Sequence, residues 1–247
     1  GGDYGIKDFP SELEKADSLS IIKSANKTVT VDESGGAINH DQLKKIIDQV
    51  GLSKVSYTKF KDNITNINKL NLATHYKDID VEITDANITA KQFTDLKTII
   101  GSGSVKAKNV KDGIDALDSS IDFEGAEKVT LVLEAGKADI STKTLDDQVS
   151  HIDLDGQTAV FSVANATGKT ISGAGSYAFS DSVTNLAKTT AKSVIQGKNV
   201  AALSTDEVTA KNISDIVTTN KAAAFNFAKA KDTAKSLDDN SASFFKN

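Results

Sequence analysis

The sequence predicts an α/β protein, an elongated β/α solenoid of about nine strand–helix units of about 25 residues each, with a parallel sheet. Two families of similar segments alternate along the 247 residues, short β-rich runs precede them, and helical stripes follow them. A repeat at such a spacing is typical of proteins whose units stack on their neighbours. We therefore expect one repeat domain over residues 1–247, cut from a longer chain.

The repeat depends on two kinds of segment. In the first, a β-branched residue precedes Asn, Thr or Ser, and in the second, Lys-Asp or a similar pair opens the segment. The copies begin at Ile38, Ile88, Ile140 and Val208 for the first kind, and at Lys7, Lys61, Lys111, Asp181 and Lys231 for the second. Equivalent positions follow one another at 24–28 residues, except for an interval of 43 between Ile140 and Val183. Repeat proteins mostly bind or assemble, so we expect no enzyme.

Each unit begins with a short run in which apolar and polar residues alternate, the pattern of a half-buried strand. These runs predict strands near residues 28–32, 55–59, 79–83, 104–108, 129–133, 177–179, 199–203 and 224–227. Because a helix connects each strand to the next, we expect neighbouring strands to pair in parallel.

A helical stripe follows each run. Thr89, for example, is placed to cap a helix whose apolar stripe lies between Phe93 and Ile100. A helix of about ten residues is marginal alone in water, so the stripe must pack on the sheet. The residues predicted to face the sheet are Leu43, Ile46, Phe93, Leu96, Ile99, Leu117, Leu186, Ile213 and Ile216.

The interval of 43 residues exceeds the period, and the excess falls in residues 148–176. There Asp155-Gly156 separates two alternating runs, which predicts the two-residue turn of a β-hairpin. We therefore predict an inserted β-hairpin, or alternatively an extra loop, at 148–176. Insertions in repeat proteins often lie on the binding face, so this segment is the first place to expect a partner contact.

The composition excludes several classes of protein. Without Cys there is no disulfide or thiol chemistry. The net charge is −5, acidic residues and lysines are interleaved, and no Arg is present, so a nucleic-acid-binding surface is not expected. No apolar run approaches the length that spans a bilayer, so we expect no transmembrane segment.

Two aspartate pairs are candidate calcium ligands. Asp78 and Asp80 are two positions apart, as are Asp153 and Asp155, so each pair projects from one side of a strand. Close carboxylates repel one another unless they are solvated or bridged by a hard cation such as Ca²⁺. Asp153 and Asp155 form the better candidate, because the turn after them also offers carbonyl oxygens. The alternative is a solvated turn in an acidic protein.

The strand–helix segments, such as the one from Tyr177 to Leu186 (YAFSDSVTNL), resemble repeats of large secreted bacterial surface proteins. These are S-layer proteins and adhesins of the RTX kind, which leave the cell by type I secretion. The resemblance implies an extracellular position on the bacterial cell surface, self-assembly or adhesion, and calcium dependence. The Gly-Gly-x-Gly-x-Asp calcium nonapeptide is absent from the sequence, so a calcium roll is not expected.

The function predicted on these grounds is structural: an S-layer lattice component or adhesin segment whose partners are other copies of itself, flanking domains or a cell-surface glycan. Such neighbours are expected to cover the terminal units around Phe9 and Phe244-Phe245. The alternative is a recognition module resembling leucine-rich-repeat proteins that binds a protein or glycan. A third alternative is a solenoidal polysaccharide lyase or hydrolase. The sugar-binding cleft of such an enzyme would be poorly supplied with side chains, because the chain has only 4 Tyr and no Trp or Arg.

Overall fold

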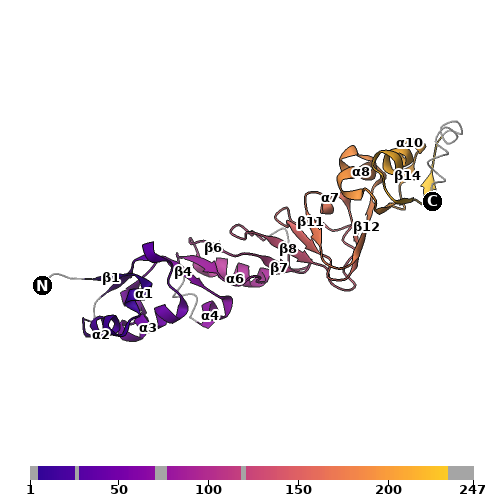
Figure 1. Cartoon of the computed structure of the whole chain (residues 1–247). Coiled ribbons are helices and arrows are strands. Elements are labelled where there is room, and N and C mark those ends of the chain that lie inside the picture. The colour runs from indigo at the N-terminus through magenta and orange to yellow at the C-terminus, as the bar shows by residue number, and fades with distance from the viewer. Residues whose placement is uncertain (1–4, 26–27, 70–76, 118–120, 233–247) are drawn as a thin grey trace. The chain divides into compact units, whose positions relative to one another are not determined.

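The computed structural model describes residues 5–25, 28–69, 77–117 and 121–232. The chain divides into two compact units, Gly1–Lys111 with Ile121–Val129, and Asp112–Ser120 with Thr130–Asn247. Figure 1 colours the first unit indigo to magenta and the second mostly orange to yellow. The single repeat domain over 1–247 stays a prediction, and the predicted contact at Phe244-Phe245 lies outside the described residues.

In both units one pattern recurs: a strand, a corner, a second strand or bridge, and then a helix or helical turn. In the first unit it begins with a single strand and two helices, and the later repeats carry longer or shorter helices. The elements are β1 (Ile6–Asp8), α1 (Pro10–Leu13), α2 (Ala16–Ala25), β2 (Val29–Val31), η1 (Glu33–Gly35), α3 (His40–Val50), η2 (Leu52–Lys54), β3 (Val55–Ser56), β4 (Lys59–Asp62), α4 (Ile64–Lys69), β5 (Asp80–Ile83), α6 (Ala90–Ile100) and β6 (Val105–Lys106).

The division between the units falls within two strands, β7 (Val110–Asp112) and β8 (Val129–Val132). The second unit continues with the same pattern but shorter helices. Its elements are β9 (His151–Asp153), β10 (Thr158–Phe161), α7 (Val163–Ala166), β11 (Thr170–Ser172), β12 (Ser176–Asp181), α8 (Val183–Ala187), η3 (Thr189–Ala191), α9 (Lys192–Ile195), β13 (Asn199–Ala202), β14 (Glu207–Val208), α10 (Ala210–Ile213), the π-helical turn η4 (Ser214–Thr219), β15 (Ala224–Asn226) and β16 (Lys229–Ala230).

Strand pairing confirms the parallel α/β prediction. Every named strand pair with a register in the described part of the chain is parallel, and the registers join residues from 18 positions apart (Thr158 and Ser176) to 26 (Val29 and Val55). The strands form several sheets of two to four strands rather than one long sheet, because corners interrupt the ladder. Isolated parallel bridges such as Ile38–Phe60 join further repeats.

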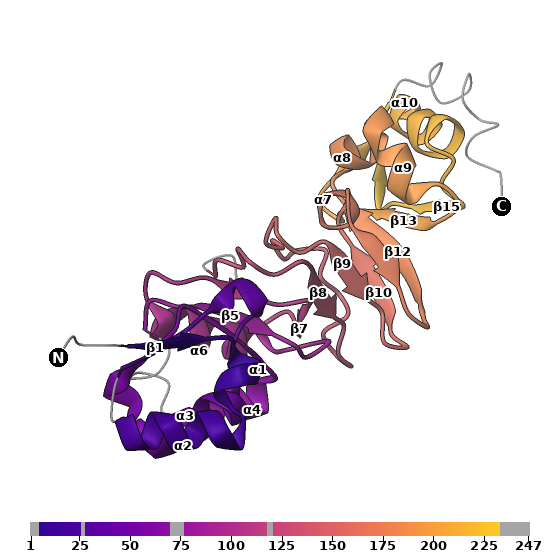
Figure 2. The same ribbon diagram turned by 60° about the vertical axis from the view of Figure 1, so that its left-hand side comes forward.

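The strand order places sequential repeats side by side within each unit. The first unit contains β1-β2-β3 and β4-β5-β6, and the second contains β11-β9-β8, β10-β12-β13-β15 and β14-β16. Figure 2 shows β10, β12, β13 and β15 as neighbours in one sheet. Sequential neighbours in parallel registers are the arrangement that a stacked repeat requires.

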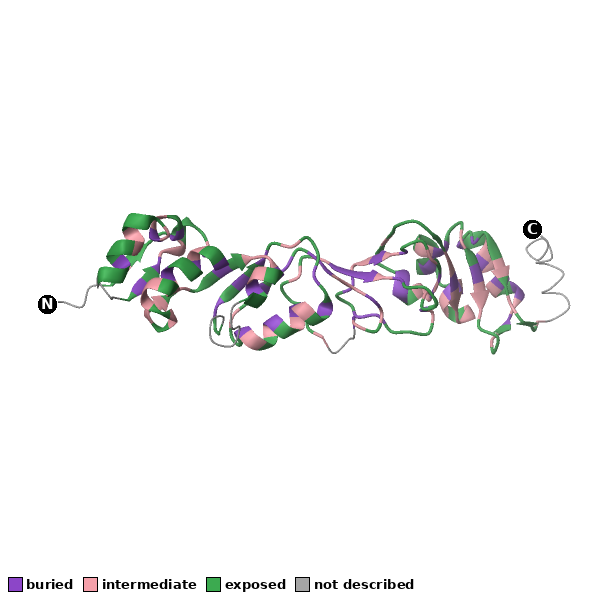
Figure 3. Cartoon of the chain, turned by 90° about the horizontal axis from the view of Figure 1, so that it is seen from below, coloured by how far each residue is buried: buried purple, intermediate pink, exposed green. Residues whose placement is uncertain are grey.

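The helices bury the stripes that the sequence indicates, and leave their outer faces exposed (Figure 3). Asn39 and Thr89 each form a capping box with the glutamine three residues later, which fixes where α3 and α6 begin. All the predicted core residues except Ile99 are buried. The prediction for Ile99 is wrong: Ile100 is the buried residue, 1% exposed, because Ile100 is seven positions after Phe93 and completes the helical stripe.

The predicted β-hairpin at 148–176 is also wrong. The turn exists, since Asp155 and Gly156 have φ of 46° and 81° and the N–H of Gln157 donates to the carbonyl of Leu154 at 2.8 Å. However, β9 pairs in parallel with β8 and β11, and β10 pairs in parallel with β12. The turn is a corner between two sheets, and the segment is an additional short repeat rather than an insertion. A four-residue helix, α7, lets a repeat close in about 20 residues, so an interval of 43 holds two.

Candidate functional site: the joints between repeats

Five aspartates at or after the ends of strands each hold their repeat to the one before it. We call Asp62, Asp85, Asp181, Asp206 and Asp232 the joint aspartates. The Oδ2 atom of each accepts a hydrogen bond from the first backbone N–H of the preceding repeat's helix, 18–23 residues earlier. The pairs are His40–Asp62 (2.9 Å), Ile64–Asp85 (2.6 Å), Val163–Asp181 (2.9 Å), Val183–Asp206 (2.6 Å) and Ala210–Asp232 (3.0 Å).

Some joint aspartates serve two helices at once. The Oδ1 atom of Asp62 accepts from the N–H of Asn63 at 2.7 Å and from the side chain of Asn66 at 2.9 Å, at the start of its own repeat's helix. Asp181 repeats this arrangement with Ser182 and Asn185. The first N–H groups of a helix have no partner inside the helix, and the positive end of the helix dipole favours a carboxylate there. One aspartate therefore satisfies the beginnings of two successive helices.

The first joint shows what happens when the donor is missing. The first residue of α1 is Pro10, which has no N–H. The Oδ1 atom of Asp32, 22 residues later, accepts from the N–H of Ser34 at 3.1 Å and from its hydroxyl at 2.7 Å. Its Oδ2 atom lies 3.6 Å from the ammonium group of Lys7, in the preceding repeat, so an ion pair takes the place of the backbone hydrogen bond. These hydrogen bonds hold the pKa of Asp32 below its usual value.

Asp78 and Asp80, the first predicted calcium pair, also reach the next repeat. The Oδ1 atom of Asp78 accepts from the hydroxyl of Ser102 at 2.8 Å, and the Oδ1 atom of Asp80 accepts from the hydroxyl of Ser104 at 2.7 Å. The backbone N–H groups of the same serines donate to the same oxygens at 3.3 and 3.1 Å. The serine hydrogen bonds lower the pKa of both carboxyls.

Asp153 and Asp155, the second predicted pair, lie at the corner between β9 and β10. The Oδ1 atom of Asp153 accepts from the N–H of Asp155 at 3.2 Å. The next repeat passes close by, since a Cβ added to Gly173 would lie 2.3 Å from that oxygen. No group of three or more His, Cys, Asp or Glu side chains that could hold a metal gathers among the described residues. Calcium binding at either pair stays a prediction.

Two buried asparagines bind the carbonyl groups of a preceding repeat in the second unit. Asn165 is 5% exposed and Asn220 is fully buried. The acceptors are the carbonyl oxygens of Ile140 (2.6 Å) and Lys143 (3.0 Å) for Asn165, and of Leu186 and Lys188 (2.8 Å each) for Asn220. A buried amide that satisfies two backbone acceptors fixes the spacing between repeats.

Sequence reasoning found the joint segments as a repeat but missed what they do. The signal was present: Asp62 and Asp232 each lie 22 residues after the first residue of a capped helix, His40 and Ala210. The asparagines carry no such signal, because Asn in a polar chain is expected at caps and turns.

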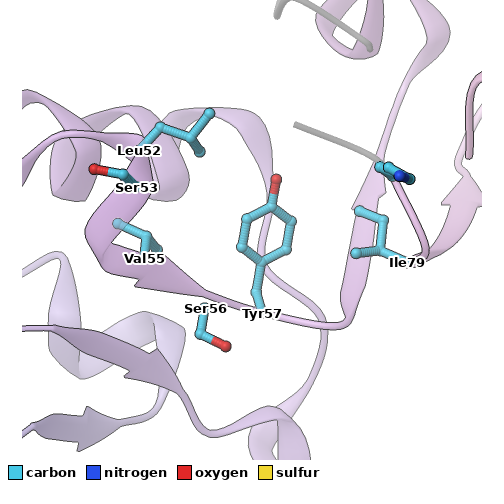
Figure 4. Close-up of a pocket in the computed structure, with 7 residues that line it drawn as sticks. Leu52, Ser53, Val55, Ser56, Tyr57 and Ile79 are labelled. Atoms are coloured by element: carbon cyan, nitrogen blue, oxygen red, sulfur yellow. The ribbon is translucent and has the colours of Figure 1, made fainter. Parts of the chain in front are cut away.

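The described part of the first unit also contains a cavity of about 600 Å³ beside Tyr57. Leu52, Val55 and Ile79 line it with Ser53, Ser56 and Lys77. Figure 4 shows the Tyr57 ring between the segment from Leu52 to Val55 and the side chain of Ile79. Burial of the ring raises the pKa of its hydroxyl.

No helix in the described ranges has the length and apolar character needed to cross a bilayer. Comparisons of the chain with protein-family models, with curated proteins and with solved structures found no match.

Proposed function

We propose that the chain is a structural segment of a bacterial cell-surface protein, an S-layer lattice component or adhesin, whose repeats continue as one β/α solenoid. The observation that carries the proposal is the set of joints. The carboxylates of Asp62 and Asp181 accept hydrogen bonds from the preceding repeat, so these oxygen atoms are not available for catalysis or ligand binding. Each joint couples neighbouring repeats through a charge-assisted hydrogen bond, which suits a protein that carries mechanical load.

The proposal places the chain outside the cell, with other copies of itself, flanking domains or a surface glycan as partners. Calcium belongs to the proposal at Asp153 and Asp155, where the corner adds carbonyl oxygens to two carboxylates. At Asp78 and Asp80 one oxygen of each carboxylate is already bound to a serine. We therefore expect calcium to shift the amide NMR signals around 153–156 before those around 78–80, and Asp153→Asn with Asp155→Asn to abolish the shifts.

Electron microscopy of intact source cells tests the location and the role together. Gold-labelled antibodies against the purified chain should mark the outer surface in a regular layer or on extended fibres. The purified chain should form sheets or fibres when it is concentrated with calcium. Label confined to the cell interior, together with a chain that stays dispersed, would contradict the structural role.

The cavity beside Tyr57 is the observation that favours the alternative, a recognition module. Its apolar wall, tyrosine ring, hydroxyls and Lys77 ammonium suit a saccharide that carries an acidic group. Saturation-transfer NMR with uronic acid oligosaccharides tests it, with Tyr57→Ala and Lys77→Ala as variants and Lys44→Ala, on the exposed face of α3, as control. Binding lost in the first two variants and retained in the third would support recognition.

A further inference from the structure

The corner between β5 and α6 carries an N-glycosylation sequon, the pattern Asn-x-Ser/Thr in which the asparagine side chain can be linked to a sugar. The sequon runs from Asn87 to Thr89, and both of these residues are exposed, whereas Ile88 between them is 3% exposed. Ile88 forms a parallel bridge with Val110, so the backbone is extended at this point. In an extended segment, residues two positions apart project from the same side. The amide of Asn87 and the hydroxyl of Thr89 therefore face solvent together.

The side chain of Asn87 can carry a sugar and keep its contact with the next repeat. Its Oδ1 atom accepts a hydrogen bond from the Nδ2 atom of Asn109 at 2.7 Å. An N-linked sugar replaces one hydrogen of the Asn87 amide nitrogen, and the amide oxygen keeps its lone pairs. The hydrogen bond from Asn109, which is 6% exposed, is therefore compatible with the modification.

The other sequons in the described part of the chain lack this arrangement. Each of them overlaps a helix, where residues two positions apart do not face each other. They begin at Asn63, just before α4, at Asn165, in α7, and at Asn212, in α10. Asn165 is 5% exposed and its amide nitrogen donates to two carbonyl groups, so no sugar fits there. Among the sequons that the structure describes, the one at Asn87 is both extended and exposed.

We propose that Asn87 is a site of N-glycosylation. The amide nitrogen attacks the anomeric carbon of a glycosyl diphosphate, which forms the N–C bond and breaks the C–O bond to the diphosphate. The diphosphate leaves, and the amide nitrogen gives up one proton to a base of the transferase. The donor is a nucleoside diphosphate sugar inside the cell or a polyprenyl diphosphate saccharide at the membrane. This inference depends on the proposed function, because a cell-surface protein meets the transferases that use these donors before or during its export.

Mass spectrometry of the protein purified from its source cells tests the site. Trypsin releases residues 78–91, a peptide in which Asn87 is the only asparagine. This peptide should carry the added mass of a sugar, and electron-transfer fragmentation should place the sugar on Asn87 rather than on Thr84 or Thr89. A single hexose indicates the nucleoside diphosphate donor, and a preassembled oligosaccharide indicates the polyprenyl donor. The peptides that contain the other sequons of the described residues should have their unmodified masses.

Variants expressed in the source cells separate the sequon from the fold. Asn87→Gln and Thr89→Ala should each abolish the modification, and Thr89→Ser should retain it because serine keeps the hydroxyl. Thr209→Ala is the matched control and should also retain it. This change removes the capping box of α10, as Thr89→Ala removes that of α6, but it leaves the Asn87 sequon intact.

Three results would each overturn the inference: a wild-type peptide 78–91 found only at its unmodified mass, a sugar placed on a threonine, or a sugar that persists in Asn87→Gln. The outcome for the proposed function is separate. If the sugar is absent while antibodies still mark the cell surface, the structural role stands and only the glycosylation site is removed. Sugar on Asn87 of a protein found only inside the cell would support the site and contradict the surface location.

Discussion

The two units build the same repeat with helices of different length. The longest helices of the first unit, α3 and α6, have 11 residues each, whereas α7, α8 and α9 in the second unit have four or five. The first unit also holds the shorter α1 and α4, of four and six residues, and α10 of the second unit continues into the six-residue turn η4. The strand registers follow this difference, since β10 and β12 are joined at a spacing of 18 residues and β2 and β3 at 26. The length of the repeat is therefore set by its helix, while the strands and joints stay constant.

In the second unit, the buried side-chain amides of Asn165 and Asn220 donate hydrogen bonds to backbone carbonyl groups of an earlier repeat. The carbonyl groups at the end of a helix have no partner within it. In the first unit the end of α3 is closed by Gly51, whose N–H donates to the carbonyl of Ile47 at 2.7 Å. In the second unit Asn220 donates to the carbonyls of Leu186 and Lys188, at the end of α8. The end of α3 is therefore closed locally, whereas the end of α8 is also closed from a later repeat.

The largest expected effect is in the core of the first unit and tests the register of α6. Ile100→Ala should lower the free energy of unfolding by about 2–5 kcal/mol, the usual range for truncating a buried isoleucine. Ile99→Ala, the same change one residue earlier, should cost less than about 1.5 kcal/mol, because Ile99 is half-buried. Urea denaturation measures both. Equal costs would show that the long helix does not present the stripe described here.

The next effect is in the second unit and tests whether its asparagines replace helix length. Asn220→Ala removes both hydrogen bonds, but the carbonyl of Lys188 keeps the N–H of Ala191 as a donor at 3.0 Å, so the change should cost about 1–2 kcal/mol. Asn226→Ala, at an exposed position of β15, is the control and should change stability by less than about 0.5 kcal/mol. If Asn220→Ala lowers the free energy of unfolding no more than Asn226→Ala does, the buried asparagine does not stabilise the end of the short helix.

A smaller effect should be shared by the two units, because both use the same joint. Asp85→Ala in the first unit and Asp206→Ala in the second each remove an acceptor 2.6 Å from the first N–H of a helix. Each should cost about 1 kcal/mol, the usual value of an N-terminal cap. Asp95→Ala, in an exposed ion pair with Lys91, should cost less than about 0.5 kcal/mol. Unequal costs at Asp85 and Asp206 would show that the joint is not a common element.

The sequence predicted the repeating strands, their parallel pairing and the buried helical stripes, but it missed the side chains that hydrogen-bond from one repeat to another. Strands, parallel pairing and buried stripes follow from local periodicity, and they were found near the predicted residues. The hairpin at Asp155-Gly156 was wrong because a turn sequence determines the bend but not the partners of the strands on either side. The joint aspartates and Asn220 act on residues 18–34 positions away, and such a partner is set by the stacking rather than by neighbouring residues.

The smallest expected effect on stability concerns the hydrogen bonds from Ser102 to Asp78 and from Ser104 to Asp80 in the first unit, and it should depend on pH. Ser102 and Ser104 hold the pKa values of Asp78 and Asp80 below the ordinary 3.8. A carboxyl whose pKa is depressed by folding stabilises the fold above its unfolded pKa, and this contribution is lost as the pH falls through the folded pKa. Ser102→Ala with Ser104→Ala should therefore raise both pKa values toward 3.8, as measured by carboxyl ¹³C shifts. The difference in free energy of unfolding between variant and wild type should be fully present at pH 6 and should decrease below pH 3.8.

Ser34→Ala is the control. It should raise the pKa of Asp32 and leave the pKa values of Asp78 and Asp80 unchanged, since the hydroxyl of Ser34 donates to Asp32. A gap that is constant down to pH 2 would mean that the serines stabilise the joint without acting through the charge of the carboxylates.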